Sequence, residues 1–354
     1  MKQARLDQDA IVAALKGRTL RVPDLTSFFG AWPPAELHPR RAAVVASVVD
    51  AALGSHPSLA RRRDDDIASL VSLWYPRAAD RDIEALALYA VWLVCWDDTV
   101  DEGEGDLAGD FDGAERWRSQ TLDVVRAALQ IDGTGADKDS DVINAVFRDF
   151  GDRLSQAAPI EQRQALYEEI RFFIASCGVE QQLRLEKHIP DYDTYMDFRL
   201  GTIGGAMLCS LIEFANGEPL PARVSAAPQT RALWTHVCTL LTFVNDLLSL
   251  KKELRTDCVI NAVTALLAPS SDGGLDGVVA ELQRKISRAV DDFDVAAREL
   301  LGMVEGGEAQ RGVVARYIDG CRAIVTGTLR FTLQSPRYNI AKLLKDDGTL
   351  EIVL

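Results

Sequence analysis

Three carboxylates stand at the end of an apolar stretch of the chain. Asp97 and Asp101 are four residues apart, so in a helix they lie one turn apart on one face, with Asp98 beside them. Carboxylates this close repel one another and resist removal from water. A hard cation such as Mg²⁺ would remove that cost, because it prefers oxygen ligands. Two interpretations stay open: a metal site, or a solvated helix end that runs into an acidic loop.

A second polar stripe follows the apolar string TLLTFV. Asn245, Ser249 and Glu253 recur every four residues and therefore share one helical face. An amide oxygen, a hydroxyl and a carboxylate aligned in this way can chelate one hard cation. Lys252 falls on the same side and can bind an anion that arrives with the metal. The alternative is an ordinary polar stripe on an amphipathic helix, which is weaker here because all three ligand types share the face.

Together these segments resemble the DDxxD and (N/D)DxxSxxxE motifs of class I terpene synthases. The match is closest to the short, single-domain microbial sesquiterpene cyclases, and the motif order and the separation of about 150 residues agree. The string YMDFRLGTIGG at 195–205, Asn261 in CVINAV, and the pair Arg337-Tyr338 extend the resemblance. It runs from about residue 74 to residue 338, whereas residues 1–50 and 340–354 carry little of it.

The resemblance implies a Mg²⁺-dependent terpene cyclase. Such an enzyme ionises farnesyl diphosphate by abstracting pyrophosphate, and cyclises the allylic cation to a sesquiterpene hydrocarbon or alcohol. The family uses three Mg²⁺ ions, for which Mn²⁺ is a substitute to consider. The implied metal ligands are Asp97, Asp98, Asp101, Asn245, Ser249 and Glu253. The implied diphosphate ligands are Arg199, Lys252, Arg337 and Tyr338.

Glycines at positions 201, 204 and 205 predict a break in the helix that carries Arg199. In the family, a kink here points a backbone carbonyl at the substrate and couples diphosphate sensing to ionisation. The resemblance makes Arg199 the sensor, Thr202 the linker, and Ile203 or Gly204 the effector, although bacterial relatives often have an acidic linker. The alternatives are close packing at small residues and, for Arg199, a surface ion pair with Asp197 or Glu180.

A carbocation must be kept from water in an apolar pocket, with aromatic faces to stabilise its charge. Helical projection places Leu93 and Val94 on the face of Asp97, and turns Trp92 and Trp96 by roughly 100° to 140° into the core. The other pocket candidates are Phe172, Phe173, Leu241, Thr242 and Phe331.

Helices must position these residues, because strand-like alternation is almost absent from the sequence. We predict an all-α fold in which residues 1–354 form one catalytic domain, a helical bundle around a deep apolar cavity. Helix-length patterns cover 81–96, 141–157, 161–186, 191–215, 229–255, 276–304 and 308–334. Polar loops are predicted at 102–113, 131–141, 216–228 and 268–277.

Composition supports a large core and limits the partners. The chain has 354 residues, of which 47% are hydrophobic, and a net charge of −14 that opposes nucleic acid and acidic membranes. We find no signal peptide, no run of about 18 apolar residues and no CxxC pair among the six cysteines. We therefore expect a cytoplasmic monomer or homodimer with free thiols, no membrane span, and a prenyl diphosphate as its substrate.

Three alternative functions stay open: a cyclase for geranylgeranyl or geranylfarnesyl diphosphate, a chain-elongating prenyl diphosphate synthase, and an inactive helical protein that binds prenyl diphosphates. Three further acidic strings are not interpreted as sites. Residues 137–141 lack the glycine and glutamate of a calcium loop. Residues 64–66 follow three arginines and predict a charged turn or helix start, and residues 291–294 lie in a patterned helix.

Overall fold

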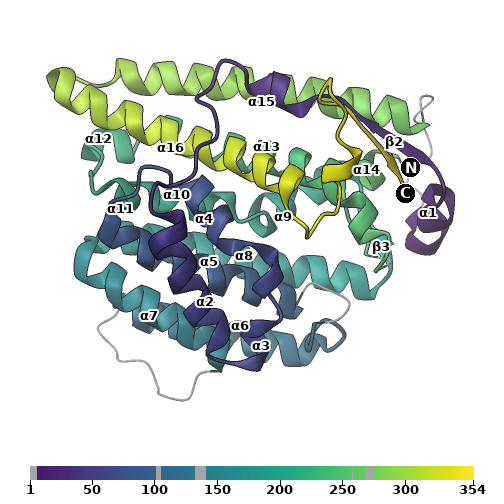
Figure 1. The fold of residues 1–354 in the computed structure, drawn as a ribbon, viewed down its shortest axis with the longest axis horizontal. Helices are drawn as coiled ribbons and strands as arrows, with labels where there is room; N and C mark the ends of the chain where they lie inside the picture. The colour runs from purple at the N-terminus through teal and green to yellow at the C-terminus, as the bar shows by residue number, and fades with distance from the viewer. Residues whose placement is uncertain (1–5, 101–104, 132–140, 257, 268–273) are drawn as a thin grey trace.

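A computed structural model describes residues 6–100, 105–131, 141–256, 258–267 and 274–354. Long helices make up most of it, as predicted, and they agree with the predicted ranges to within a few residues (Figure 1). These helices are α5 (Asp80–Val100), α7 (Val142–Ala157), α8 (Ile160–Leu185), α13 (Pro228–Glu253), α15 (Gly274–Gly302) and α16 (Gly307–Gln334).

The sequence patterns missed several elements. Helix α6 (Phe111–Ala128) follows the acidic loop, and Asp110 caps it by accepting a hydrogen bond from the Gly113 N–H. The region before α5 holds α1 (Gln8–Leu15), α2 (Ala46–Gly54), α3 (Pro57–Ala60) and α4 (Ile67–Trp74), with 3₁₀ turns η1 (Leu25–Phe29) and η3 (Arg63–Asp65) and a π-helical turn η2 (Arg41–Val45).

The predicted helix over 191–215 is three helices. They are α9 (Tyr192–Thr202), α10 (Gly205–Ser210) and α11 (Ile212–Asn216). The first break comes where Gly204 takes a left-handed conformation with φ of 69°, which a residue with a side chain rarely adopts. Two short helices, α12 (Ala222–Ser225) and α14 (Ala262–Leu266), flank α13.

Short strands join the two ends of the chain. Strand β2 (Thr19–Val22) pairs antiparallel with β4 (Leu350–Val353), with Leu20 opposite Ile352, after the 3₁₀ turn η4 (Ala341–Leu343). Strand β1 (Leu6–Asp7) pairs with β3 (His188–Ile189) beside α1. Both pairs lie on the right-hand side of the molecule in Figure 1. The alternation that these strands show is too short to predict from sequence.

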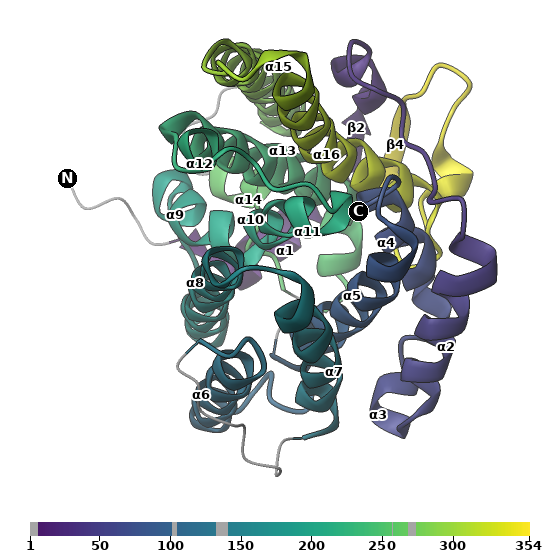
Figure 2. The same ribbon diagram turned by 90° about the vertical axis from the view of Figure 1, so that its left-hand side faces the viewer.

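Helix α13 lies inside the bundle. It packs against α15 and α16 on one side and against α9, α10 and α14 on others. Helix α5 packs against α4 and α7. Helix α8 packs against α6 and α9. Figure 2 shows α15 and α16 on the opposite side of the bundle from α6 and α7. The buried apolar side chains form one continuous cluster among these helices.

Two segments are apolar and long enough to cross a membrane by composition, namely Tyr192–Asn216 and Pro228–Glu253. In each segment, 72% of the most apolar window is buried inside the protein, so both serve as core helices of this fold. All six cysteines are free thiols, and all except Cys258 are buried.

Replacing Gly201 with alanine should destabilise the fold. An added Cβ would lie 2.7 Å from the Ser176 Cβ and 2.1 Å from its hydroxyl oxygen, so α8 and α9 would have to separate. We expect the free energy of unfolding, measured by urea titration, to fall by about 1–3 kcal/mol.

Gly277 provides the matched control, because it lies within α15 with open space around it. Gly277→Ala should stabilise the protein slightly, since alanine favours helix interiors. Equal effects of the two substitutions would contradict the close helix contact at Gly201.

Candidate active site

A cavity of about 420 Å³ opens among the ends of α5, α8, α9, α13 and α16. Its polar lining comes from both predicted motifs and from the predicted cations, and its apolar lining comes from residues deeper in the helices. The polar lining includes Asp65, Asp97, Asp98, Glu180, Arg184, Arg199, Asn245, Ser249, Lys252, Glu253, Arg337 and Tyr338. The structure therefore brings together residues that are up to 273 positions apart, from Asp65 to Tyr338.

The apolar lining contains five of the pocket candidates: Leu93, Val94, Phe173, Leu241 and Phe331. The candidates Phe172 and Thr242 are not among the residues that line the cavity. Phe172 is 45% exposed, because one residue turns a helix by about 100° and Phe173 takes the inward position. Thr242 is fully buried.

Trp74 is a pocket residue that the sequence did not single out. It lies at the end of α4, and its indole N–H donates to the Thr328 hydroxyl at 2.9 Å; both residues line the cavity. Trp92 and Trp96 are completely buried, as predicted for core residues, and Trp96 stacks on Trp117 with ring centroids 5.1 Å apart. Trp74, Phe173 and Phe331 thus line the cavity together with the polar ring of Tyr338.

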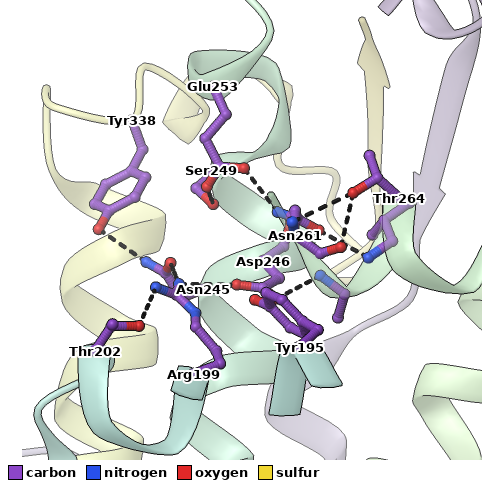
Figure 3. A network of polar contacts seen from close by, with 12 residues as sticks. Tyr195, Arg199, Thr202, Asn245, Asp246, Ser249, Glu253, Asn261, Thr264 and Tyr338 are labelled. Carbon is purple, nitrogen blue, oxygen red and sulfur yellow. Dashed lines mark hydrogen bonds and ion pairs between the residues drawn. The ribbon is translucent and has the colours of Figure 1, made fainter. Parts of the chain in front are cut away.

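Arg199 is the centre of the polar network in Figure 3. Its Nη2 donates to Asn245 Oδ1 at 2.8 Å and to Asp246 Oδ1 at 2.9 Å, and its Nη1 donates to Thr202 Oγ1 at 3.3 Å. Of the two partners considered from sequence, Asp197 is exposed, whereas Glu180 lines the cavity and its negative charge acts on Arg199. The guanidinium is 12% exposed, so its contacts are shielded from water.

Asp246 fixes this arginine, and the sequence interpretation gave it no role. Its carboxylate is completely buried and accepts hydrogen bonds from the Tyr195 hydroxyl, from Arg199 and, at 2.8 Å, from the Ala262 N–H. A buried carboxylate needs such partners. Its position directly after Asn245, about 100° around the helix from it, was the available signal.

The second predicted ligand face is assembled on α13. The Ser249 hydroxyl donates to Glu253 Oε1 at 2.5 Å, and Asn245 Nδ2 donates to the Tyr338 hydroxyl at 3.3 Å. Asn261 caps α14 and donates to Glu253 Oε2 at 2.8 Å. Burial, together with the nearby negative charge of Asp246, raises the pKa of Glu253 to about 7.

This donor set fits a hard divalent cation. Its amide, hydroxyl and carboxylate oxygens lie on one face of the cavity, and a cation would stabilise the ionised form of Glu253 that burial disfavours. No group of three His, Cys, Asp or Glu side chains gathers at one point within the described ranges. A metal held here would therefore depend on neutral oxygens, and on oxygens of its ligand, as well as on carboxylates.

The first motif divides its carboxylates between two surroundings. Asp97 and Asp98 both line the cavity, but Asp98 is only 6% exposed and forms ion pairs with Arg337 and Arg62. These arginines occupy Asp98 with partners that the sequence interpretation did not assign to it. Asp101 lies outside the described residues.

The helix break places backbone in the cavity wall. Thr202, Ile203 and Gly204 all line the cavity, and Thr202 accepts from Arg199. The Gly204 carbonyl accepts from the Leu208 N–H at 3.3 Å, whereas no backbone hydrogen bond to the Ile203 carbonyl is found in the described part of the chain. Ile203 therefore has the carbonyl with more capacity to meet a ligand.

Comparisons with known proteins agree with this geometry. Residues 89–292 match the model of terpene synthase family 2, C-terminal metal binding. Sesquiterpene cyclase hepA of Aspergillus oryzae is 27% identical, over 98% of this chain and 96% of its own length. The (+)-eremophilene synthase of Gibberella fujikuroi is 25% identical, over 90% of this chain and 88% of its own length.

Solved structures share the fold. Germacradien-4-ol synthase from Streptomyces citricolor superposes with a TM-score of 0.71 at 20% identity, over 85% of this chain and 96% of that one. The linalool/nerolidol synthase from Streptomyces clavuligerus, solved with 2-fluorogeranyl diphosphate, gives a TM-score of 0.69 at 19% identity, over 85% and 97% of the two chains. The helical bundle is therefore the class I terpenoid synthase fold.

Replacing Asp246 with asparagine should strongly destabilise the protein. The substitution keeps the shape but leaves the buried Arg199 without its charged partner, so we expect the free energy of unfolding to fall by about 3–5 kcal/mol. Asp197→Asn, on the exposed side of α9, is the control and should change it by less than about 0.5 kcal/mol. If a urea titration gave similar losses of unfolding free energy for the two variants, the buried pair of Arg199 with Asp246 would not contribute to stability as we propose.

Metal affinity should depend on pH through Glu253. Only the ionised carboxylate binds metal, so with a pKa of about 7 the affinity for Mn²⁺ should fall about 10-fold from pH 8 to pH 6. Calorimetric titrations would measure this affinity. Glu253→Gln should bind more weakly but without this slope, and an unchanged slope would contradict the assignment. The free energy of unfolding of the metal-free protein should depend on pH in the opposite direction: the raised pKa of Glu253 adds stability at low pH, and this stability is lost as the pH rises toward 7.

Proposed function

The chain belongs to terpene synthase family 2, and from that membership we propose that it is a Mg²⁺-dependent cyclase that converts farnesyl diphosphate into a cyclic sesquiterpene. One observation supports this function above the others. Two faces of oxygen donors and several cations surround the mouth of one cavity, while its deeper wall is apolar and aromatic. A substrate with a charged diphosphate head and a hydrocarbon tail matches that division.

The mouth of the cavity would hold the diphosphate and its metal ions. Asp97 would supply metal ligands from α5, together with Asp101 beyond the described residues, and Asn245, Ser249 and Glu253 would supply them from α13. Bound Mg²⁺ neutralises the charge that develops on a pyrophosphate leaving group. Arg199, Lys252, Arg337 and the Tyr338 hydroxyl all line this part of the cavity and would donate hydrogen bonds to the diphosphate oxygens.

The contacts of Arg199 support a link between diphosphate binding and ionisation. A diphosphate that draws the guanidinium toward itself would also pull on Thr202, to which Arg199 donates. Thr202 directly precedes Ile203, whose carbonyl is at the helix break. A shift of that carbonyl toward the allylic carbon would stabilise positive charge as the carbon–oxygen bond breaks.

The deeper chamber would guide the cation after pyrophosphate leaves. Leu93, Val94 and Leu241 exclude water, and the rings of Trp74, Phe173 and Phe331 offer their faces to positive charge. The relative that matches 98% of this chain is named a sesquiterpene cyclase, which supports a C15 substrate. We also propose that the chain works as one catalytic domain in the cytoplasm, which its six free thiols support.

Incubation with C10, C15, C20 and C25 diphosphates and Mg²⁺, followed by gas chromatography–mass spectrometry, tests the function. We expect cyclic C15 products from farnesyl diphosphate and none when Mg²⁺ is chelated. A second set of incubations with added isopentenyl diphosphate separates elongation from cyclisation. A longer prenyl diphosphate as the product would show chain elongation and overturn the proposal. Conversion of the C20 or C25 substrate alone would overturn the sesquiterpene assignment, and binding without turnover would indicate an inactive protein.

Loss of ligands from either face should abolish most turnover. Asp97→Asn removes a charge at the mouth and Asn245→Ala removes an amide oxygen, and each should lower kcat by at least about 100-fold. Asp291→Asn serves as the control because Asp291 is exposed on α15, away from the cavity. Wild-type turnover in the Asp97 or Asn245 variant would show that the metal assignment is wrong.

A further inference from the structure

Four charged side chains form a compact cluster at the rim of the cavity, which we call the rim cluster. Two of them, Arg62 and Asp65, come from the string RRRDDD that the sequence interpretation assigned to a charged turn. The other two are Asp98 at the end of α5 and Arg337 in the segment after α16. Because Asp65 also lines the cavity, the string contributes to the site as well as to the turn.

Arg337 is held between two carboxylates. Its Nη1 lies 2.8 Å from Asp65 Oδ2, and its Nη2 lies 2.8 Å from Asp98 Oδ1. Arg62 supports both acids, since its Nε lies 2.5 Å from Asp98 Oδ2 and its Nη1 lies 3.6 Å from Asp65 Oδ2. Two positive and two negative charges thus alternate, and the rim cluster is neutral as a whole.

The rim cluster is shielded enough for these ion pairs to matter. The exposed fractions of its side chains are 20% for Arg62, 16% for Asp65, 6% for Asp98 and 17% for Arg337. Surface pairs are worth little, but removal of one partner from a shielded network leaves another charge without its counter-ion. Asp64, the preceding residue, is exposed and offers a direct comparison within the same string.

Arg337 needs an external support because it lies outside regular structure. Helix α16 ends at Gln334, and Arg337 is in a turn before the short helix η4. One carboxylate can hold one edge of a guanidinium, but the side chain can still swing about that contact. A second carboxylate from another element fixes the plane of the guanidinium.

We propose that Asp65 is a positioning residue for diphosphate binding. It holds the Arg337 guanidinium at the rim in the orientation in which Arg337 donates to the diphosphate, and it does so without touching substrate itself. This inference rests on the proposed function, because the role of Arg337 as a diphosphate ligand comes from there.

A double-mutant cycle on inorganic pyrophosphate binding tests the proposal without any need for turnover. Calorimetry with saturating Mg²⁺ would compare the wild type with Asp65→Asn, Arg337→Gln and the double variant. We expect Asp65→Asn to weaken pyrophosphate binding about 10-fold on its own, and less than about 2-fold when Arg337 is already replaced. Asp64→Asn should bind like the wild type, and Asp65→Glu should recover most of the affinity.

Turnover separates positioning from a merely structural role. Asp65→Asn should raise KM for farnesyl diphosphate and lower kcat, while its melting temperature stays close to that of Asp64→Asn. Equal losses of affinity in both backgrounds, or wild-type affinity in Asp65→Asn, would overturn the inference. If Asp65→Asn does not fold, Asp65→Ser completes the same cycle with Arg337→Gln, and equal losses in the two backgrounds would overturn the inference. A wild-type protein that binds no pyrophosphate would instead overturn the proposed function.

Discussion

A completely buried carboxylate, Asp246, holds the arginine on which the site depends. It accepts from Tyr195, Arg199 and the backbone of α14, so it fixes α9, α13 and α14 to one another at one point. The cost of burying its charge is offset only if all three partners stay in place. The same contact keeps Arg199 beside Asn245 and Thr202, between the ligand face of α13 and the helix break.

The wider charge pattern follows the same rule of pairing. A chain with a net charge of −14 would repel a diphosphate, yet the cavity mouth gathers Arg199, Lys252 and Arg337 near the carboxylates. Arg199 and Arg337 form ion pairs with neighbouring carboxylates, so their charges are balanced before a ligand arrives. Glu253 is the exception, because burial favours its neutral form, and a cation would restore its charge.

The sequence predicted the long helices and much of the cavity because their signals are local and periodic. Asp97 belongs to a motif on one face of α5, and Asn245 and Glu253 belong to a motif on one face of α13, so the helical pitch places the residues of each motif. Asp65, Arg62 and Trp74 could not be predicted, because their roles arise from contacts with residues more than 30 positions away. The inward direction of Phe173 rather than Phe172 could not be predicted either, because it depends on which helices pack against α8.

The central claim is that both ligand faces and the cations act on one diphosphate. A crystal structure with Mn²⁺ and pyrophosphate, located by anomalous scattering, tests it most directly. The account predicts Mn²⁺ at Asp97 and at the Asn245, Ser249 and Glu253 face, with Arg199 and Arg337 donating to a single pyrophosphate between them. Metal at neither face, or a pyrophosphate bound away from Arg199 and Arg337, would contradict the account.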